Sequence, residues 1–81
     1  MFISLDFETH LIGNGAVFPK PICLSTYDGK NTQLLNAKDA REYLSAQLEG
    51  NSWIAHNAVF ECGVIITHFP ELAEKVEHFS F

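Results

Sequence analysis

The sequence predicts an α/β domain on a mixed sheet, in which three strands, a helix, a fourth strand and a second helix follow one another (βββαβα). Apolar and polar residues alternate over residues 2–8, which is typical of a strand with one buried face. The turn sequence "DGKN" separates two stretches rich in β-forming residues. A helical spacing of apolar residues over 37–49 is then followed by a short apolar run and a second helical pattern.

The first half of the chain is predicted to form three strands. In the first strand Ile3, Leu5 and Phe7 share one face, because side chains on a strand alternate between its two faces. The stretch "LIGNGAVFPKP", residues 11–21, contains two Gly and two Pro and is expected to be a loop. "ICLSTY" and "TQLL" flank the turn "DGKN", so residues 22–35 are expected to form a hairpin.

A helix is predicted over residues 37–49. Asn36 precedes it as a helix-capping residue, and Gly50 follows it at a position that favours glycine. Four apolar side chains recur on one face of this helix: Ala37, Ala40, Leu44 and Leu48.

The last elements are a short strand and two helices. "SWIA" reads as the fourth strand, and the helix between the third and fourth strands is expected to bring the fourth strand beside the first and parallel to it. A second helix is predicted over residues 58–69. Pro70 ends it and begins a short third helix.

Length, composition and charge limit the classes of protein to consider. With 81 residues the chain is one domain, and a hydrophobic content of 47% with seven Phe indicates a packed core. A net charge of −5 argues against a protein that binds nucleic acid mainly through a basic surface. It does not argue against a metal-dependent nuclease, because a bound divalent cation reverses the local field. No apolar run is long enough to span a bilayer, and we expect a cytoplasmic protein.

Two carboxylates lie together near the end of the first strand. Asp6 and Glu8 are two residues apart and therefore project from the same face. Their mutual repulsion raises the pKa of one of them unless a cation neutralises the pair. Mg²⁺ and Mn²⁺ prefer oxygen ligands, so a divalent metal is one interpretation; two solvated acids at the end of a strand are the other.

A third carboxylate enters with the second helix. Asn57 is at the N-cap position, and Glu61 lies one turn later, where the helix dipole favours an acidic side chain. If the first and fourth strands are neighbours, this turn lies close to the acidic end of the first strand. Asp6, Glu8 and Glu61 are then expected to converge; ordinary first-turn capping is the alternative for Glu61.

These stretches resemble motifs of a known enzyme superfamily. "ISLDFETH" resembles the first motif, D-x-E-T, of the DEDD (DnaQ-like) 3′-5′ exonucleases, and "AHNAVFE" resembles their second motif, N-x-x-F-D. The surrounding sequence is most similar to the N-terminal proofreading domain of phage family A DNA polymerases, over residues 2 to 75. The resemblance implies a ribonuclease H-like fold, here a partial one, and a host-cell cytoplasmic location if the chain is phage-encoded.

The resemblance also implies roles for individual residues. Asp6 would bridge two Mg²⁺ or Mn²⁺ ions, Glu8 would ligate the ion that activates the attacking water, and Glu61 would support the other ion, so that these three would be both catalytic and metal-binding. The substrate would be the 3′ end of single-stranded DNA, which the resemblance places against three further residues: Thr9, Asn57 and Phe60. Phe60 as a plain core residue is the alternative.

The chain departs from the superfamily pattern in two places. Glu61 is one methylene longer than the usual Asp, and an ångström of displacement can cost about a hundredfold in rate. The third motif, a Tyr or His followed by an Asp, is missing from these 81 residues. We therefore expect residues 1–81 to be the N-terminal portion of an exonuclease domain, as a truncated or split product, that is inactive alone.

Two alternatives stay open. The chain could be a non-catalytic remnant or binding module of a phage-type DNA polymerase. It could also belong to a nuclease that acts on RNA, because nothing in these residues reads the 2′ position. A strand at 53–55 that forms the edge of the sheet is expected to pair with a partner chain or with a second copy.

Overall fold

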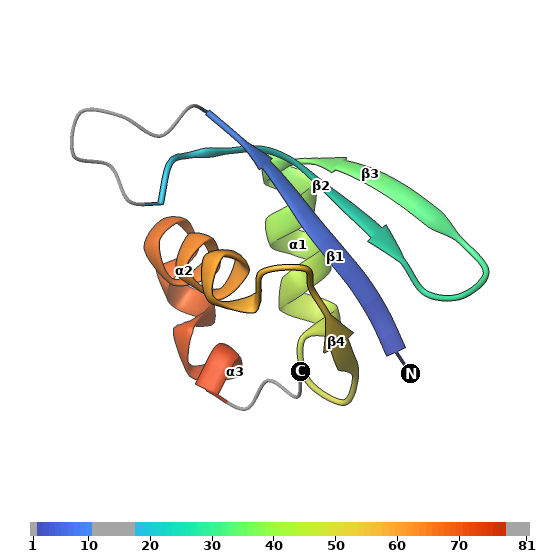
Figure 1. Cartoon of the computed structure of the whole chain (residues 1–81). Helices are drawn as coiled ribbons and strands as arrows, with labels where there is room; N and C mark the ends of the chain where they lie inside the picture. Colours follow the sequence, from blue (N-terminus) through green and yellow to red (C-terminus); the bar gives the residue numbers. More distant parts are fainter. Residues whose placement is uncertain (1, 11–17, 78–81) are drawn as a thin grey trace.

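The computed structural model describes residues 2–10 and 18–77 and shows a four-stranded mixed sheet with helices (Figure 1). The order of strands across the sheet is β3-β2-β1-β4. The elements are β1 (Phe2–Thr9), β2 (Pro21–Tyr27), β3 (Thr32–Asn36), α1 (Ala37–Gln47), β4 (Ser52–Ile54), α2 (Ala58–His68), the 3-10 helix η1 (Pro70–Leu72) and α3 (Ala73–Glu77).

The predicted α/β class and mixed sheet are confirmed, and the elements follow the expected order. Their ends differ from the predicted ends by one or two residues; α1, for example, ends at Gln47 and β4 covers 52–54. Of the predicted loop, residues 11–17 lie outside the described ranges. The last residues of the predicted third helix, 78 and 79, lie outside them as well.

The fourth strand is the element that positions the candidate site. As predicted, β4 pairs with β1 in parallel, in the register Phe2–Ser52 to Ser4–Ile54. The strand has only three residues, so within residues 2–10 and 18–77 no strand pairs with the second half of β1 on this side. The chain turns instead into α2, which begins beside that half of β1 (Figure 1).

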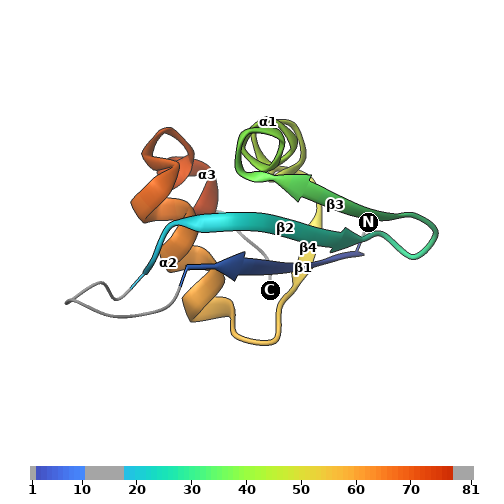
Figure 2. The same cartoon turned by 90° about the horizontal axis from the view of Figure 1, so that it is seen from above.

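Helix α1 covers one face of the sheet, and the core lies between them (Figure 2). The buried face of β1 carries Ile3, Leu5 and Phe7, as the alternation predicts. The other core residues come from β2, β4, the helices α1, α2, η1 and α3, and the C-cap residues of α1 and α2: Leu24, Ala40, Leu44, Leu48, Trp53, Val64, Ile65, Phe69, Leu72 and Val76.

The opposite face of the sheet, which we call the open face, is not covered by an element within the described ranges. The strand registers place twelve residues on it: Phe2, Ser4, Asp6 and Glu8 of β1, Cys23, Ser25 and Tyr27 of β2, Thr32, Leu34 and Asn36 of β3, and Ser52 and Ile54 of β4. Four large apolar side chains on this face are solvent-exposed: Phe2, Tyr27, Leu34 and Ile54. They lie beside Ser4 and Ser25.

The turn between β2 and β3 is fixed by local hydrogen bonds. Oδ1 of Asp28 accepts from the backbone N–H of Lys30 at 2.9 Å and of Asn31 at 2.7 Å. These donors lower the pKa of the Asp28 carboxyl, because they stabilise its charged form. Gly29 has a φ of 98°, a left-handed conformation that glycine adopts without steric cost. The turn sequence therefore sets the hairpin register.

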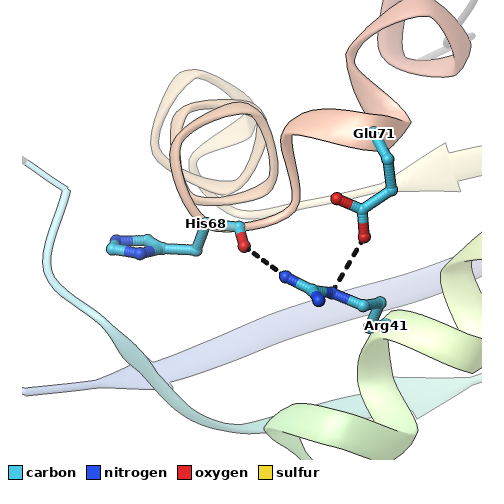
Figure 3. Close-up of polar contacts among 3 residues, drawn as sticks. All are labelled: Arg41, His68 and Glu71. Atoms are coloured by element: carbon cyan, nitrogen blue, oxygen red, sulfur yellow. Dashed lines mark hydrogen bonds and ion pairs between the residues drawn. The ribbon is translucent and has the colours of Figure 1, made fainter.

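Arg41 ties α1 to the end of α2 (Figure 3). Its Nη2 donates to the carbonyl oxygen of His68 at 2.8 Å, and its Nε lies 2.9 Å from Oε1 of Glu71. The guanidinium also lies 4.9 Å from the centre of the Phe69 ring. A cation near the last carbonyls of a helix is favourable, so Arg41 holds the corner between α2 and η1 against α1.

The segment that leads into β2 is held against α2 by Phe18. The ring of Phe18 lies directly over Gly63, where an added Cβ would overlap ring carbons of Phe18. The Phe18 ring also packs on Phe60, with centroids 6.2 Å apart, and the carbonyl of Phe18 lies 2.7 Å from Nε2 of His68. Gly63 is thus the gap in α2 into which this aromatic ring fits.

We predict that Gly63→Ala destabilises the chain although alanine favours helices. The added methyl displaces Phe18, and overpacking of this kind costs about 1–3 kcal/mol, more than the gain of at most about 1 kcal/mol in helix propensity. In a Phe18→Ala background the ring is absent, so the same change is expected to stabilise. Urea unfolding of the wild type, the two single variants and the double variant measures whether Gly63→Ala raises or lowers the free energy of unfolding in each background. A stabilising effect of Gly63→Ala in the wild type would contradict the packing of Phe18 against Gly63.

Candidate active site

Asp6 and Glu8 lie side by side on the open face of β1. Both side chains are solvent-exposed, and their cross-strand partners on β2 are Ser25 and Cys23. The expectation that the two carboxylates project together from one face is confirmed. A β-bulge follows at once, between Glu8 and Thr9, where the register with β2 shifts. Bulges re-aim the side chains beside them, so the acidic pair stands where the sheet loses its regular geometry.

Glu61 is buried beside β1, with only 3% of its surface exposed. It lies in the first turn of α2, where Oδ1 of Asn57 caps the N–H of Phe60 at 3.2 Å. Its Oε2 accepts a hydrogen bond of 3.1 Å from the backbone N–H of Phe7. Asp6 and Glu8 direct their backbone N–H and C=O groups toward β2. The N–H of Phe7, which lies between them in the sequence, therefore points away from β2, toward the side of β1 on which β4 and α2 lie.

This contact completes the sheet. A longer fourth strand would supply a carbonyl to the N–H of Phe7, but β4 ends after Ile54. A buried N–H without a partner costs about 1–3 kcal/mol, and the Glu61 carboxyl supplies the missing acceptor. The helix that follows β4 therefore fills the role of the absent strand through one side chain.

The environment of Glu61 favours its protonated form. Burial, and to a smaller extent the negative charge of Asp6, raise the pKa of its carboxyl from 4.5 to about 7, against the opposite effect of the hydrogen bond from Phe7. Burial of Cys62 and the charge of Glu61 likewise raise the pKa of the Cys62 thiol. The structure thus brings Asp6 and Glu61 within electrostatic range of each other.

The carboxylates supply the oxygen ligands that Mg²⁺ and Mn²⁺ prefer, but they do not form a closed set. Asp6 and Glu8 have their oxygens directed to solvent, whereas one oxygen of Glu61 is engaged by Phe7. Within residues 2–10 and 18–77, no group of three or more His, Cys, Asp or Glu side chains is arranged to hold a metal ion. The same part of the chain encloses no pocket.

The three residues expected to contact a substrate are placed near the acids but already have local partners. Oγ1 of Thr9 donates to the carbonyl of His10 at 3.1 Å, and Asn57 serves as the N-cap of α2. Phe60 is half-buried and packs on Phe18 and the core, in line with the alternative of a core residue.

Sequence reasoning missed two features of this region. It assigned Glu61 a first-turn role but did not foresee that its carboxyl would accept from Phe7, and it overlooked the pairing of Phe18 with Gly63. A glycine inside an apolar helical run was a signal for the second feature, because glycine at such a site marks close packing. The brevity of the fourth strand was the signal for the first.

A comparison with known protein families, with curated proteins and with solved structures found no match to this chain. No helix within the described ranges has the length and apolar character needed to cross a membrane.

Proposed function

We propose that this chain carries the first two carboxylate motifs of a metal-dependent 3′-5′ exonuclease that acts on the 3′ end of single-stranded DNA by two-metal hydrolysis. The observation that carries the proposal is the approach of Glu61, on α2, to Asp6, on β1, beside the exposed Glu8. Asp6 and Glu61 are 55 positions apart in the sequence, and the parallel pairing of β1 with β4 brings them together.

The topology supports the same proposal. An antiparallel unit of three strands, a crossover helix and a fourth strand parallel to the first are compatible with a partial ribonuclease H-like fold. The acidic pair at the carboxyl-terminal end of the central strand β1 fits the first motif of such nucleases. The start of α2 at the same end fits the second.

Within this proposal each side chain has a limited task. Asp6 and Glu8 hold the divalent ion through their exposed oxygens, and Glu61 sets the charge beside Asp6 while it fixes the backbone of Phe7. When bound, Mg²⁺ or Mn²⁺ supplies an activated water and stabilises the charge of the leaving 3′-oxygen. Thr9, which follows Glu8, and Asn57, which caps α2, would contact the terminal nucleotide.

A non-catalytic role is the second candidate, and one observation favours it. Glu61 is buried, its neutral form is favoured, and it accepts from the backbone of β1. A carboxyl used in this way stabilises the fold without any metal. The chain would then be a remnant or binding module of a phage-type polymerase that retains its acidic pair on the surface.

We predict weak binding of Mn²⁺ or Mg²⁺ that depends on Asp6. Only two exposed carboxylates are available, so affinity is expected to be lower than at a complete site. Titration calorimetry should show heat for the wild type and none for Asp6→Ala. Glu42→Ala, which removes an exposed acid on α1, is the matched control and should titrate like the wild type. Identical curves for Asp6→Ala and the wild type would remove the metal site from the proposal.

The partners proposed with this function are a DNA 3′ end and a protein chain. A partner strand or a second copy is proposed to pair with the exposed edge at β4. The side chain of Ile54 is 56% exposed there, but β4 offers only three residues of backbone.

A further inference from the structure

Helix α2 makes two polar contacts with the strands and segments around the acidic end of β1. In its first turn, Oε2 of Glu61 accepts from the backbone N–H of Phe7 at 3.1 Å. In its last turn, Nε2 of His68 lies 2.7 Å from the carbonyl oxygen of Phe18. The first contact joins the helix to β1, and the second joins it to the segment that leads into β2.

The segment that leads into β2 is tied in turn to the end of β1. The backbone N–H of His10, directly after β1, donates to the carbonyl of Lys20 at 3.0 Å. This bond lies beyond the β-bulge between Glu8 and Thr9, where the regular pairing with β2 is interrupted. A side chain that holds the carbonyl of Phe18 therefore acts, through this segment, on the acidic end of β1.

The two contacts lie on one face of α2, two turns apart. Glu61 and His68 are 7 positions apart in the sequence, which in an α-helix is nearly two full turns and about 10 Å along the axis. Val64 and Ile65 are buried between them, but apolar contacts are not directional. A helix held by one hydrogen bond can pivot about that point. Two hydrogen bonds on the same face fix its direction and its rotation against the sheet.

We propose that His68 is a positioning residue for the candidate active site, an inference that rests on the metal-dependent function proposed above. Its Nε2–H holds the carbonyl of Phe18. Through that segment it keeps Asp6 and Glu8 of β1 in a fixed position relative to Glu61 of α2. His68 acts through its neighbours and takes no part in metal binding itself.

The contact requires a hydrogen-bond donor at Nε2. A carbonyl oxygen only accepts, so Nε2 of His68 carries a proton, in the neutral ring and in the charged ring alike. Gln can place an amide N–H at a similar position, whereas Phe keeps a ring but offers no donor. The main-chain carbonyl of His68 binds Arg41, and the ring points away from that guanidinium (Figure 3). Changes to the side chain therefore test the contact with Phe18 and leave the contact with Arg41 in place.

Hydrogen exchange of the Phe7 amide, followed by NMR on the metal-free chain, tests the positioning directly. The amide of Ser25, in the middle of β2, is the reference, because unfolding of the whole chain exposes both amides alike. In His68→Phe, and in His68→Asn with its shorter amide, the protection of Phe7 relative to Ser25 is expected to fall at least tenfold. His68→Gln should keep the wild-type ratio. Lys75→Met is the matched control and should also keep it, since it removes a contact of 2.7 Å with the carbonyl of Ser45, between α3 and α1.

Titration with Mn²⁺ connects the positioning to the proposed site. His68→Phe is expected to bind Mn²⁺ about tenfold more weakly than the wild type, the lower end of the range for residues that orient metal ligands. His68→Gln and Lys75→Met should bind like the wild type. A wild type that binds no Mn²⁺ would overturn the metal site, whereas the Phe7 ratio would still decide whether His68 holds β1 against α2.

Four results would each overturn the proposal for His68. They are an unchanged Phe7 ratio in both His68→Phe and His68→Asn, an equal fall of that ratio in Lys75→Met, a fall in His68→Gln as large as in His68→Phe, and an Mn²⁺ affinity that His68→Phe leaves unchanged.

Discussion

As pH rises from 4.5 to 7, the folded chain will lose about 3 kcal/mol of stability through Glu61. The pKa of this carboxyl is raised from 4.5 to about 7 by burial, followed by the charge of Asp6. The folded state therefore binds the proton more tightly than the unfolded state. The stabilisation is complete below pH 4.5, declines across this window, and is absent above pH 7.

Glu61→Gln is the matched variant for this measurement. The carboxamide oxygen can accept from the N–H of Phe7 as the carboxyl does, but it does not titrate. Urea unfolding with a chelator present, at several values of pH, should give a falling free energy of unfolding for the wild type. The slope for Glu61→Gln should be nearly flat in this window. Equal slopes for the two proteins would show that Glu61 is not the titrating group.

Metal-dependent cleavage of a 3′-labelled single strand is expected only when a chain with the third motif is added, and it will fall to background in Asp6→Ala. Residues 1–81 contain the first-motif acids Asp6 and Glu8. They do not contain the third motif, a Tyr or His followed by an Asp, that would complete such a site. Catalytic groups that act as a unit are not additive, so the partial set alone should give no measurable turnover. The negative net charge further disfavours binding of DNA by these residues alone.

The size of the loss should differ between Asp6 and Glu61. Glu61→Gln keeps the contact with Phe7 and is expected to lower cleavage by about 10- to 100-fold, as do changes to groups that support metal ligands. Glu42→Ala should cleave like the wild type. Cleavage by the 81-residue chain alone, lost in Asp6→Ala, would contradict the need for a third motif. Absence of cleavage even with the added chain would favour the non-catalytic role.

The sequence alone determined the local structure well, because local signals decide it. The alternation in β1 exposes Asp6 and Glu8 and buries Leu5, and the turn at Asp28 and Gly29 fixes the hairpin by its own hydrogen bonds. Asn36 caps α1 as expected, with Oδ1 2.8 Å from the N–H of Asp39. Each of these depends on residues that are close in the chain, so their spacing was sufficient to predict them.

The sequence also predicted that the acids would meet, through one inference about topology. Once a crossover helix sets β4 parallel to β1, the start of α2 must lie near the end of β1 that carries Asp6. That Glu61 approaches Asp6 is in line with this expectation. A metal site and an exonuclease activity remain predictions, since they depend on ligands and partners that sequence patterns only imply.

Tertiary structure alone decided what Glu61 does and where Phe18 packs. The side chain is buried because β4 stops after three residues and leaves the N–H of Phe7 without a strand to pair with. Phe18 fits against Gly63 because a helix and a distant segment meet there. Burial and unpaired backbone groups are properties of the assembled sheet, so residues distant in sequence must first be brought together before either exists.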